Sequence, residues 1–307
     1  MKFYIFIFFI CQLSPPISSA WAGSGHILIL NSDASVVKYT TTEKEFQAHL
    51  TLSYTSLDLG GDTRPVDTKQ IQASINQLAP DVIFCIGTKA LTVAQKLPTK
   101  HKLVFSSIMN WRRLPLDENT YGISNDLHVG MQVNMLHYLF PGMQRIGILY
   151  SEQFNKEWVE LATIEAANAG IKIIGYPIKD VNQLDKILEE RLSDLEAIWL
   201  IADPLVLANK NNVEKIFHFG EARKKPIFTY SDVFAPFGAT MVMSVDLPTI
   251  ARQAAMLAEN LAKGMPPPKE RVPDPAGSNI ALNKKKILRY GLPLNKKALG
   301  AVNTFIE

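Results

Sequence analysis

Short runs of consecutive apolar residues, rich in β-branched side chains, recur along the chain and alternate with segments of helical period. They lie at residues 27–30, 50–54, 82–86, 103–106, 146–150, 171–176, 197–201, 227–230 and 240–243. Several are apolar at consecutive rather than alternating positions, which is typical of strands covered on both faces. The pattern therefore predicts buried, parallel strands.

The segments between these runs have the period of helices. Ile71, Ile75 and Leu78 share one helical face, and the segment 155–169 ends at Gly170, a helix stop directly before the next run. Strands that alternate with helices throughout predict right-handed βαβ units, and so an α/β fold with parallel sheets.

Two sheets fit the pattern better than one. The polar stretch 115–120 is expected to be a connector, and a second series of strands and helices begins at Tyr121. Near the end of the chain, Gly264 and the prolines that follow it stop a long helix over 247–263. Two lobes of ordinary domain size are therefore expected in this chain of 307 residues.

The first 22 residues have the composition of a secretory signal peptide. One charge, Lys2, precedes the apolar run 3–10, and small residues follow up to Ala20-Trp21-Ala22. The run is too short to span a bilayer, and no stop-transfer charges follow it, which disfavours the alternative of an uncleaved anchor. Cleavage after Ala22, or after Ala20, is expected to leave a soluble, monomeric protein in the periplasm.

Charge and cysteine content narrow the possible partners. The net charge of +3 and the absence of a dense basic block other than 284–286 argue against a nucleic-acid partner. Of the two cysteines, Cys11 lies in the signal segment. Cys85 lies in an apolar run, where it is expected to be a small buried residue.

Candidate ligand-binding residues follow the predicted strands, because ligands of open parallel sheets bind beyond the carboxyl ends of the strands. Hydroxyl, amide, carboxylate and aromatic side chains at these ends suit hydrogen bonding and stacking of a small polar ligand. The candidates are Asn31, Thr88, Ser107, Asn110, Trp111, Tyr150, Asp203 and Tyr230. For residues such as Asn31, the alternative is that the side chain only caps a helix.

The sequence contains no Gly-x-Ser-x-Gly elbow, no phosphate-binding loop of the Gly-x4-Gly-Lys type and no Gly-x-Gly-x-x-Gly. His218 and Glu221 stand three apart on a predicted helix, a spacing that suits two metal ligands, but a solvated helix face is the better interpretation. No metal, no cofactor and no enzymatic activity are expected.

A series of short segments stands in a familiar order and spacing. They are Ile86-Gly87-Thr88, residues 121–126, 139–150 and 166–171, Ala202-Asp203, Val245-Asp246-Leu247 and the tail 280–293. Together they resemble the substrate-binding proteins of ABC importers with the type I periplasmic-binding fold, in particular the group often linked to aromatic amino acids. The resemblance covers nearly the whole chain after the signal segment.

The resemblance implies two Rossmann-like lobes joined by three crossovers, with a ligand clamped between them. It places residues 23–120 plus 244–264 in the first lobe and 121–243 plus 265–307 in the second. It implies that Thr88 and nearby helix amides hold a ligand carboxylate, and that Tyr150 and Asp203 lie on the second lobe's inner rim, where Asp203 holds an ammonium group. Asp246, the last candidate ligand-binding residue, falls at the third crossover.

One segment departs from the pattern of this family. The family usually has an Asp-Pro pair after the fourth strand, where this chain has residues 107–113 with Asn110, Trp111 and Arg112. An arginine at this point is suited to bind an acid or a phosphate, so the usual ligand class does not transfer directly.

Three functions compete at this point. The first is a binding protein that delivers a small solute to the membrane permease of an ABC importer. The second is a ligand-sensing subunit that acts on a receptor kinase of the membrane. The third is an exported α/β enzyme, for which the sequence offers no defined pair of acid and base. The first is favoured.

Overall fold

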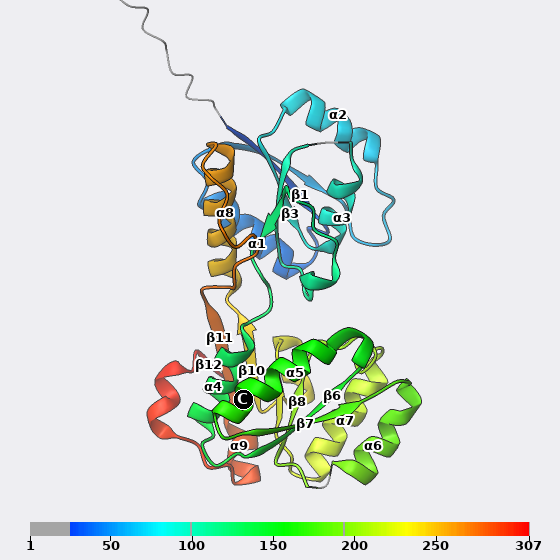
Figure 1. The fold of residues 1–307 in the computed structure, drawn as a ribbon, viewed down its shortest axis with the longest axis vertical. Helices are drawn as coiled ribbons and strands as arrows, with labels where there is room; N and C mark the ends of the chain where they lie inside the picture. Colours follow the sequence, from blue (N-terminus) through cyan, green and yellow to red (C-terminus); the bar gives the residue numbers. More distant parts are fainter. Residues whose placement is uncertain (1–24, 99, 193, 307) are drawn as a thin grey trace, which may run out of the picture.

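The computed structural model describes residues 25–98, 100–192 and 194–306, and the predicted signal peptide at 1–22 lies outside them. These residues form two α/β lobes that lie one above the other along the long axis of the molecule (Figure 1). Each lobe has its own sheet with helices on both faces. The expected fold of two Rossmann-like lobes is confirmed.

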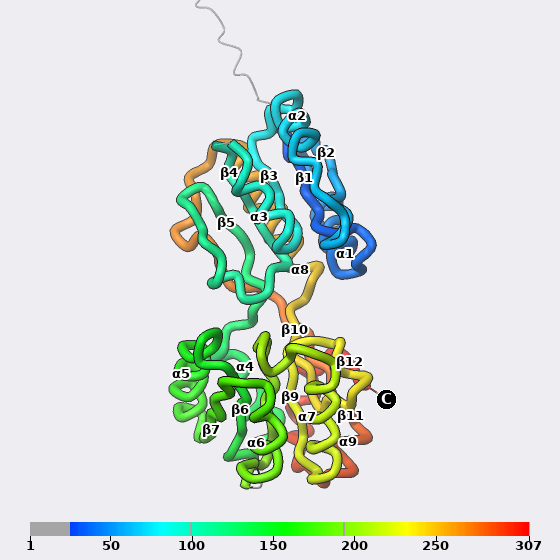
Figure 2. The backbone as a smooth tube through the Cα atoms, turned by 90° about the vertical axis from the view of Figure 1, so that its right-hand side faces the viewer, coloured from blue at the N-terminus to red at the C-terminus, as the bar shows by residue number. Residues whose placement is uncertain are grey.

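The first lobe contains a five-stranded parallel sheet in the order β2-β1-β3-β4-β5 (Figure 2). Its strands are β1 (His26–Asn31), β2 (Ser53–Asp58), β3 (Val82–Ile86), β4 (Lys102–Ser106) and β5 (Thr120–Gly122). Its helices are α1 (Val37–Ala48), α2 (Thr68–Leu78), α3 (Thr88–Lys96) and α8 (Leu247–Ala262), with the 3-10 helix η1 (Trp111–Arg113) after β4.

The central strands of this sheet contain uninterrupted apolar runs, at 27–30 in β1, 82–86 in β3 and 103–105 in β4, because both of their faces are covered. Along β1, Ile27 and Ile29 pack with α1 and α8, whereas Leu28 and Leu30 pack with α2 and α3. Successive side chains of a strand point to opposite faces, so an uninterrupted apolar run is what two covering layers require. Cys85 of β3 is fully buried in the same way, as expected.

The second lobe contains a seven-stranded sheet in the order β12-β11-β10-β9-β8-β6-β7. Its strands are β6 (Arg145–Tyr150), β7 (Lys172–Pro177), β8 (Ala197–Leu200), β9 (Ile227–Thr229), β10 (Met241–Val245), β11 (Ser278–Asn283) and β12 (Thr304–Ile306). Its helices are α4 (Val129–Leu139), α5 (Glu152–Asn168), α6 (Leu184–Arg191), α7 (Lys210–Ala222) and α9 (Lys284–Tyr290), with the 3-10 helices η2 (Val181–Gln183), η3 (Asp232–Phe237) and η4 (Lys296–Ala301). Helices α4, α5 and α9 cover one face, and α6 and α7 cover the other.

Three crossovers join the lobes. The chain passes from β5 to α4, from β10 to α8, and from α8 back to β11. Backbone hydrogen bonds hold the three segments side by side: Gly122 N–H donates to Arg271 O (3.0 Å), Ser124 N–H to Pro273 O (3.0 Å) and Asp246 N–H to Gly277 O (3.1 Å). Gly277 is closely packed between the crossovers, because an added Cβ would lie 3.0 Å from the Cβ of Thr249 and 3.1 Å from the Cβ of Asp246.

Two elements differ from the sequence expectation. The second strand is Ser53–Asp58, not 50–54, because the apolar residues Leu50 and Leu52 precede it and pack against the core below. Residues 120–122 form the fifth strand of the first sheet, whereas the sequence pattern predicts a connector at 115–120 and the start of the second series at Tyr121.

The second sheet is not entirely parallel. Strand β11 runs antiparallel to β10, with Val245 opposite Ser278. The reason lies in the crossovers: the chain leaves this lobe at the carboxyl end of β10 and returns at the same edge, so β11 must run in the opposite direction. Within the described ranges, no helix combines the length and apolarity needed to cross a membrane.

Candidate ligand-binding cleft

A pocket, here called the inner pocket, lies at the carboxyl edge of the second sheet, where a loop of the first lobe meets it. Its empty volume is about 480 Å³ including the part open to solvent. Met109 comes from the first lobe and Asp126 from the first crossover, while most of the wall belongs to the second lobe. The lining residues are Met109, Asn125, Asp126, Leu127, Gln132, Asn155, Trp158, Trp199, Ile201, Ala202, Tyr230, Met243 and Val245.

The walls of the inner pocket are largely aromatic and apolar. Trp158 of α5 meets the buried Trp199 of β8 edge to face, with ring centroids 5.2 Å apart. Tyr230, which follows β9, packs edge to face on Phe234 at 5.5 Å. Such surfaces favour a ligand with a flat or apolar body.

Two acceptors at the inner pocket are poorly satisfied. The Oδ1 atom of Asn125 is buried without a hydrogen-bond partner, while its Nδ2 atom donates to the sulfur of Met109 at 2.9 Å. Burial raises the pKa of Asp126, against the opposing effects of the Asn110 N–H and of Arg112 and Arg113. Burial and the charge of Asp126 together raise the pKa of Tyr230 to about 12, so its hydroxyl keeps its proton.

A second hollow, here called the outer groove, continues from the inner pocket and shares Asp126, Leu127, Asn155 and Trp158 with it. Its empty volume is about 1000 Å³ including open solvent. The remaining lining residues are Asn110, Arg112, Arg113, His128, Val129, Phe154, Glu157, Leu161 and Asp274. The two hollows together form one cleft between the lobes.

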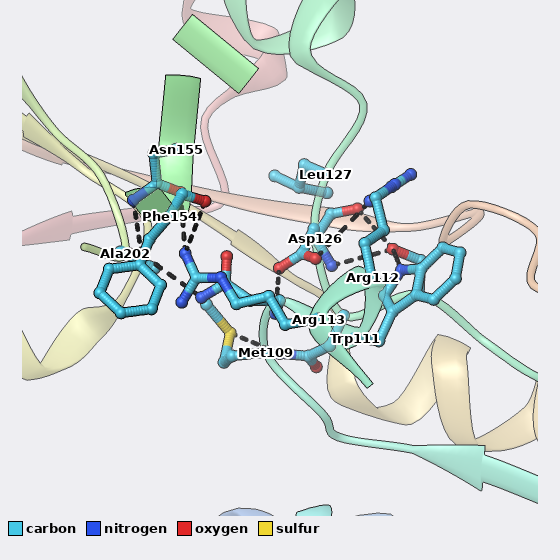
Figure 3. A network of polar contacts seen from close by, with 12 residues as sticks. Met109, Trp111, Arg112, Arg113, Asp126, Leu127, Phe154, Asn155 and Ala202 are labelled. Atoms are coloured by element: carbon cyan, nitrogen blue, oxygen red, sulfur yellow. Dashed lines mark hydrogen bonds and ion pairs between the residues drawn. The ribbon is translucent and has the colours of Figure 1, made fainter. Parts of the chain in front are cut away.

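The loop after β4 reaches from the first lobe to the second (Figure 3). Arg113 donates to Phe154 O (3.2 Å) and Asn155 Oδ1 (2.9 Å), and its guanidinium lies 5.1 Å from the centre of the Phe154 ring. Asn110 Nδ2 donates to Ala202 O at 3.3 Å. Polar contacts therefore connect the lobes directly, in addition to the three crossovers.

The backbone of this loop adopts conformations that are rare for residues with side chains. Ser107 has φ = 60° and Asn110 has φ = 52°. Asparagine tolerates this left-handed region better than most residues, and such conformations cluster at functional sites. The two reversals turn the chain so that Asn110 and Arg113 face the second lobe.

Asp203 organises the opposite wall of the cleft. It is 1% exposed, and both of its oxygens are engaged: Oδ2 accepts from Ser151 N–H, Ser151 Oγ and Asn155 Nδ2 at 2.6–2.8 Å. Oδ1 accepts from the N–H groups of Leu205 (2.9 Å) and Val206 (3.0 Å). Asp203 thereby fixes Asn155, the residue that Arg113 contacts.

The family model for ABC transporter substrate-binding proteins matches residues 60–303, which is most of the chain. The chain belongs to this family. As a substrate-binding protein and not an enzyme, it has a small-molecule ligand and a membrane transporter as its partners. A comparison with curated protein sequences gives no match.

Solved structures confirm the type I periplasmic-binding fold of this substrate-binding protein. It resembles an open, ligand-free substrate-binding protein with adhesive properties from Clostridium difficile, at TM-score 0.73 and 14% identity over 91% of this chain and 98% of that chain. It also resembles an ABC domain in complex with L-Trp from Streptococcus pneumonia, at TM-score 0.60 and 18% identity over 92% of this chain and 100% of that one. A conserved domain protein from Vibrio cholerae matches at TM-score 0.61 and 18% identity, over 92% and 99% of the two chains.

Two of the residues proposed from sequence line the cleft of this substrate-binding protein. Tyr230 lines the inner pocket, and Asn110 lines the outer groove. Asp203 lies directly behind the wall, and its oxygens are already engaged, so the structure favours a positioning role for it instead of the expected contact with a ligand ammonium.

Other proposed residues of the first lobe make structural contacts. Asn31 Nδ2 donates to Glu43 Oε2 (2.6 Å), and its Oδ1 accepts from the Asp33 N–H. The hydroxyl of Ser107 is buried against that of Thr42 at 2.9 Å. Trp111 donates to Ser124 Oγ at 3.2 Å.

Among the described residues, Thr88, Tyr150 and Asp246 line neither the inner pocket nor the outer groove. Thr88 is exposed in the first turn of α3, where it remains a proposed contact from the first lobe. Tyr150 lies against Gly175 of the neighbouring strand, where an added Cβ would come within 3.0 Å of its ring. Asp246 caps α8 and accepts from the Thr249 N–H at 3.1 Å.

No sequence pattern singles out five of the lining residues as ligand contacts: Met109, Asn125, Asp126, Asn155 and Trp158. Asp126 follows the short strand β5, so the rule that polar residues after strands face the ligand would have found it if β5 had been recognised. Trp158 lies inside a helix, where no local pattern separates a cleft residue from a core residue. Among the described residues, no cluster of side chains is suited to hold a metal.

Proposed function

We propose that this protein is the solute-binding component of an ABC importer. A cleaved signal peptide exports it to the periplasm, where it acts as a monomer. It closes its two lobes on a small polar ligand with an aromatic or amino-acid-like part and delivers the ligand to a membrane permease. Family membership supports solute binding, and members of this family typically act outside the cytoplasm.

The inner pocket carries this proposal. It lies at the carboxyl edge of a sheet, where ligands of this architecture bind, and residues of both lobes contribute to its lining. A ligand seated there would contact Met109 and Trp158 at once, so binding would favour an approach of the lobes. The L-Trp complex of the pneumococcal protein supports the inclusion of aromatic amino acids among the candidate ligands.

A ligand screen followed by one substitution tests the proposal. Amino acids, aromatic amines, nucleosides and small acids are screened for an increase in melting temperature, since a ligand that binds only the folded state stabilises it. For each compound found, Trp158→Ala is expected to weaken binding about tenfold or more, measured by calorimetry. Ile164→Ala, an exposed residue on the same helix outside the cleft, is the matched control.

Equal affinity of the parent and Trp158→Ala for every compound found would refute this location of the site. The export step has a separate test: the mass of the protein from a periplasmic extract is expected to correspond to cleavage after Ala22 or Ala20. A mature protein that retains residues 3–10 would contradict it.

A further inference from the structure

The inner pocket has one sign of charge. Among its described lining residues, Asp126 supplies the one carboxyl group, while Tyr230 keeps its proton. No arginine or lysine lines it. A ligand carboxylate placed there would face the charge of Asp126 without a cation to neutralise it.

The hydrogen-bonding groups of the inner pocket also favour a ligand that donates hydrogen bonds over one that accepts them. The Oδ1 atom of Asn125 is a buried acceptor without a donor, next to the carboxylate of Asp126 in the chain. The amides of Gln132 and Asn155 already donate, to Leu127 O and to Asp203. Buried acceptors that lack donors favour a ligand that brings N–H groups.

The arginines of the outer groove do not remove the need for a cation. Arg112 lies 3.8 Å from Asp126, but its side chain is 62% exposed, and an ion pair of this kind contributes little. Arg113 is directed to Phe154 and Asn155. The outer groove also holds the carboxylates Glu157 and Asp274, which offset the two guanidinium charges.

From this geometry, and given the cleft assigned under the proposed function, we infer that the protein binds an organic cation: a primary ammonium group on an aromatic or similarly flat apolar body. The ammonium lies between the carboxylate of Asp126 and the amide oxygen of Asn125. The apolar body lies against Trp158, Tyr230 and Met243. The aromatic faces add a cation–π attraction to the charge of Asp126.

A series of compounds that share one ring system tests this inference. Tryptamine, tryptophol, indole-3-propionate and L-tryptophan carry the same indole and differ in the charge of the side chain. Tryptamine is expected to bind about tenfold or more tightly than the alcohol and the acid, and more tightly than the zwitterion, in calorimetry at neutral pH. Phenethylamine and its alcohol and acid analogues repeat the comparison on a second ring.

The substitution Asp126→Asn is expected to reduce the affinity for the amine about tenfold and to leave the affinity for the alcohol nearly unchanged. Glu190→Gln removes one exposed carboxylate of the same lobe, on α6, and serves as the control. If Asp126→Asn does not fold, the ranking of amine, alcohol and acid on the unsubstituted protein decides. In that case the amine is also expected to bind more weakly as the pH falls through the raised pKa of Asp126.

Three results would overturn the inference: no amine of either series raises the melting temperature, the alcohol, the acid or the zwitterion binds as tightly as the amine, or Asp126→Asn leaves the affinity for the amine unchanged. A failure of this inference can be told apart from a failure of the proposed function. If the alcohol binds as well as the amine, and Trp158→Ala weakens both, the cleft is the binding site but the preference for a cation is wrong.

Discussion

Two carboxylates beside the cleft have opposite environments. Asp203 receives five hydrogen bonds from its own lobe, whereas the burial of Asp126 raises its pKa against only one backbone N–H and two arginines. The first is a buried carboxylate whose two oxygens both accept hydrogen bonds, and the second is a buried carboxylate with few partners. Their roles therefore differ, although both lie near the same wall.

Asp203→Ala is expected to destabilise the protein by about 3 kcal/mol, because several buried donors would lose their acceptor at once. Chemical denaturation measures this change in the free energy of unfolding. Asp180→Ala is the control: it is an exposed aspartate that accepts from the Asn182 N–H at 2.9 Å and is expected to cost no more than about 1 kcal/mol. Similar losses in the two variants would show that the Asp203 network adds nothing beyond one cap.

The raised pKa of Asp126 makes the stability of the protein depend on pH. Its folded-state pKa lies above the ordinary value of 3.8, so the folded protein holds the proton more tightly than the unfolded chain. Stability is therefore expected to fall as the pH rises from about 3.8 through the raised pKa. Asp126→Asn, compared with the parent by denaturation at several pH values, is expected to remove this decrease; an unchanged profile would contradict the assignment.

The difference between Asp203 and Asp126 shows which property of a residue the sequence does not reveal. The sequence predicts that Asn110, Asp203 and Tyr230 lie near the cleft, because each follows a strand and strand ends share one edge of a sheet. It did not reveal that Ser151 and Asn155 already occupy the oxygens of Asp203, since those partners come from another strand end and a helix. Whether a polar side chain is free depends on contacts between segments distant in the sequence.

At the scale of elements, α8 is the helix that the chain sends back to the first lobe. It packs with α1 and against the sheet of that lobe through Ile250, Ala254 and Ala258. Glu259 connects the C-terminal end of α8 to the segment before β2. Its Oε1 accepts from Thr51 Oγ1 (2.8 Å) and from the N–H groups of Thr51 and Leu52. Oε2 accepts from Lys263 at 2.8 Å.

Glu259→Gln is expected to destabilise the protein by about 2 kcal/mol at neutral pH. Burial alone would raise the pKa of Glu259, but the hydrogen bonds from Lys263, Thr51 and Leu52 outweigh it and lower the pKa from 4.5 to about 2. The carboxylate therefore contributes stability above pH 4.5 that is lost as the pH falls towards 2.

Denaturation of the parent and Glu259→Gln across this range measures the difference, which is expected to vanish near pH 2. Glu190→Gln on α6, whose side chain is 61% exposed, is the control and is expected to be nearly neutral at every pH. A difference between parent and variant that does not depend on pH would rule out the carboxylate charge as its cause.

The sequence predicts strands correctly where burial on both faces produces an apolar run, and less well at edge strands and short strands. The apolar runs at 82–86 and 146–150 correspond to β3 and β6 because these strands are buried on both faces. The edge strand β2 and the short β5 lack such runs, and the direction of β11 follows from the path of the chain between lobes. No local sequence pattern encodes that path.

At the scale of the molecule, Arg113 and Asn110 connect lobes that otherwise touch through the crossovers and the walls of the cleft (Figure 3). These contacts lie on the side of the cleft where η1 faces α5. They are single polar contacts, one exposed and two partly buried, so each adds only modestly to the free energy of unfolding. Their effect is on the relative position of the lobes.

Arg113→Ala is expected to increase the radius of gyration of the ligand-free protein in small-angle X-ray scattering, because one link between the lobes is lost. Its free energy of unfolding is expected to change by less than about 1 kcal/mol. Arg191→Ala, which removes a guanidinium 5.6 Å from the Tyr176 ring within the second lobe, is expected to leave the radius unchanged. The same radius in both variants would show that Arg113 does not restrain the lobes.

The three crossovers, held together by backbone hydrogen bonds, determine which motions of the lobes are easy. A single connecting chain would allow one lobe to rotate freely about it. Three chains fixed side by side resist rotation about the long axis but still bend, since a few hinge residues can absorb the change of φ and ψ that bending needs. The distance between the lobes then depends on one angle, the bend at the crossovers. A partner that contacts both lobes would bind best at one value of this angle, and so would distinguish a filled cleft from an empty one.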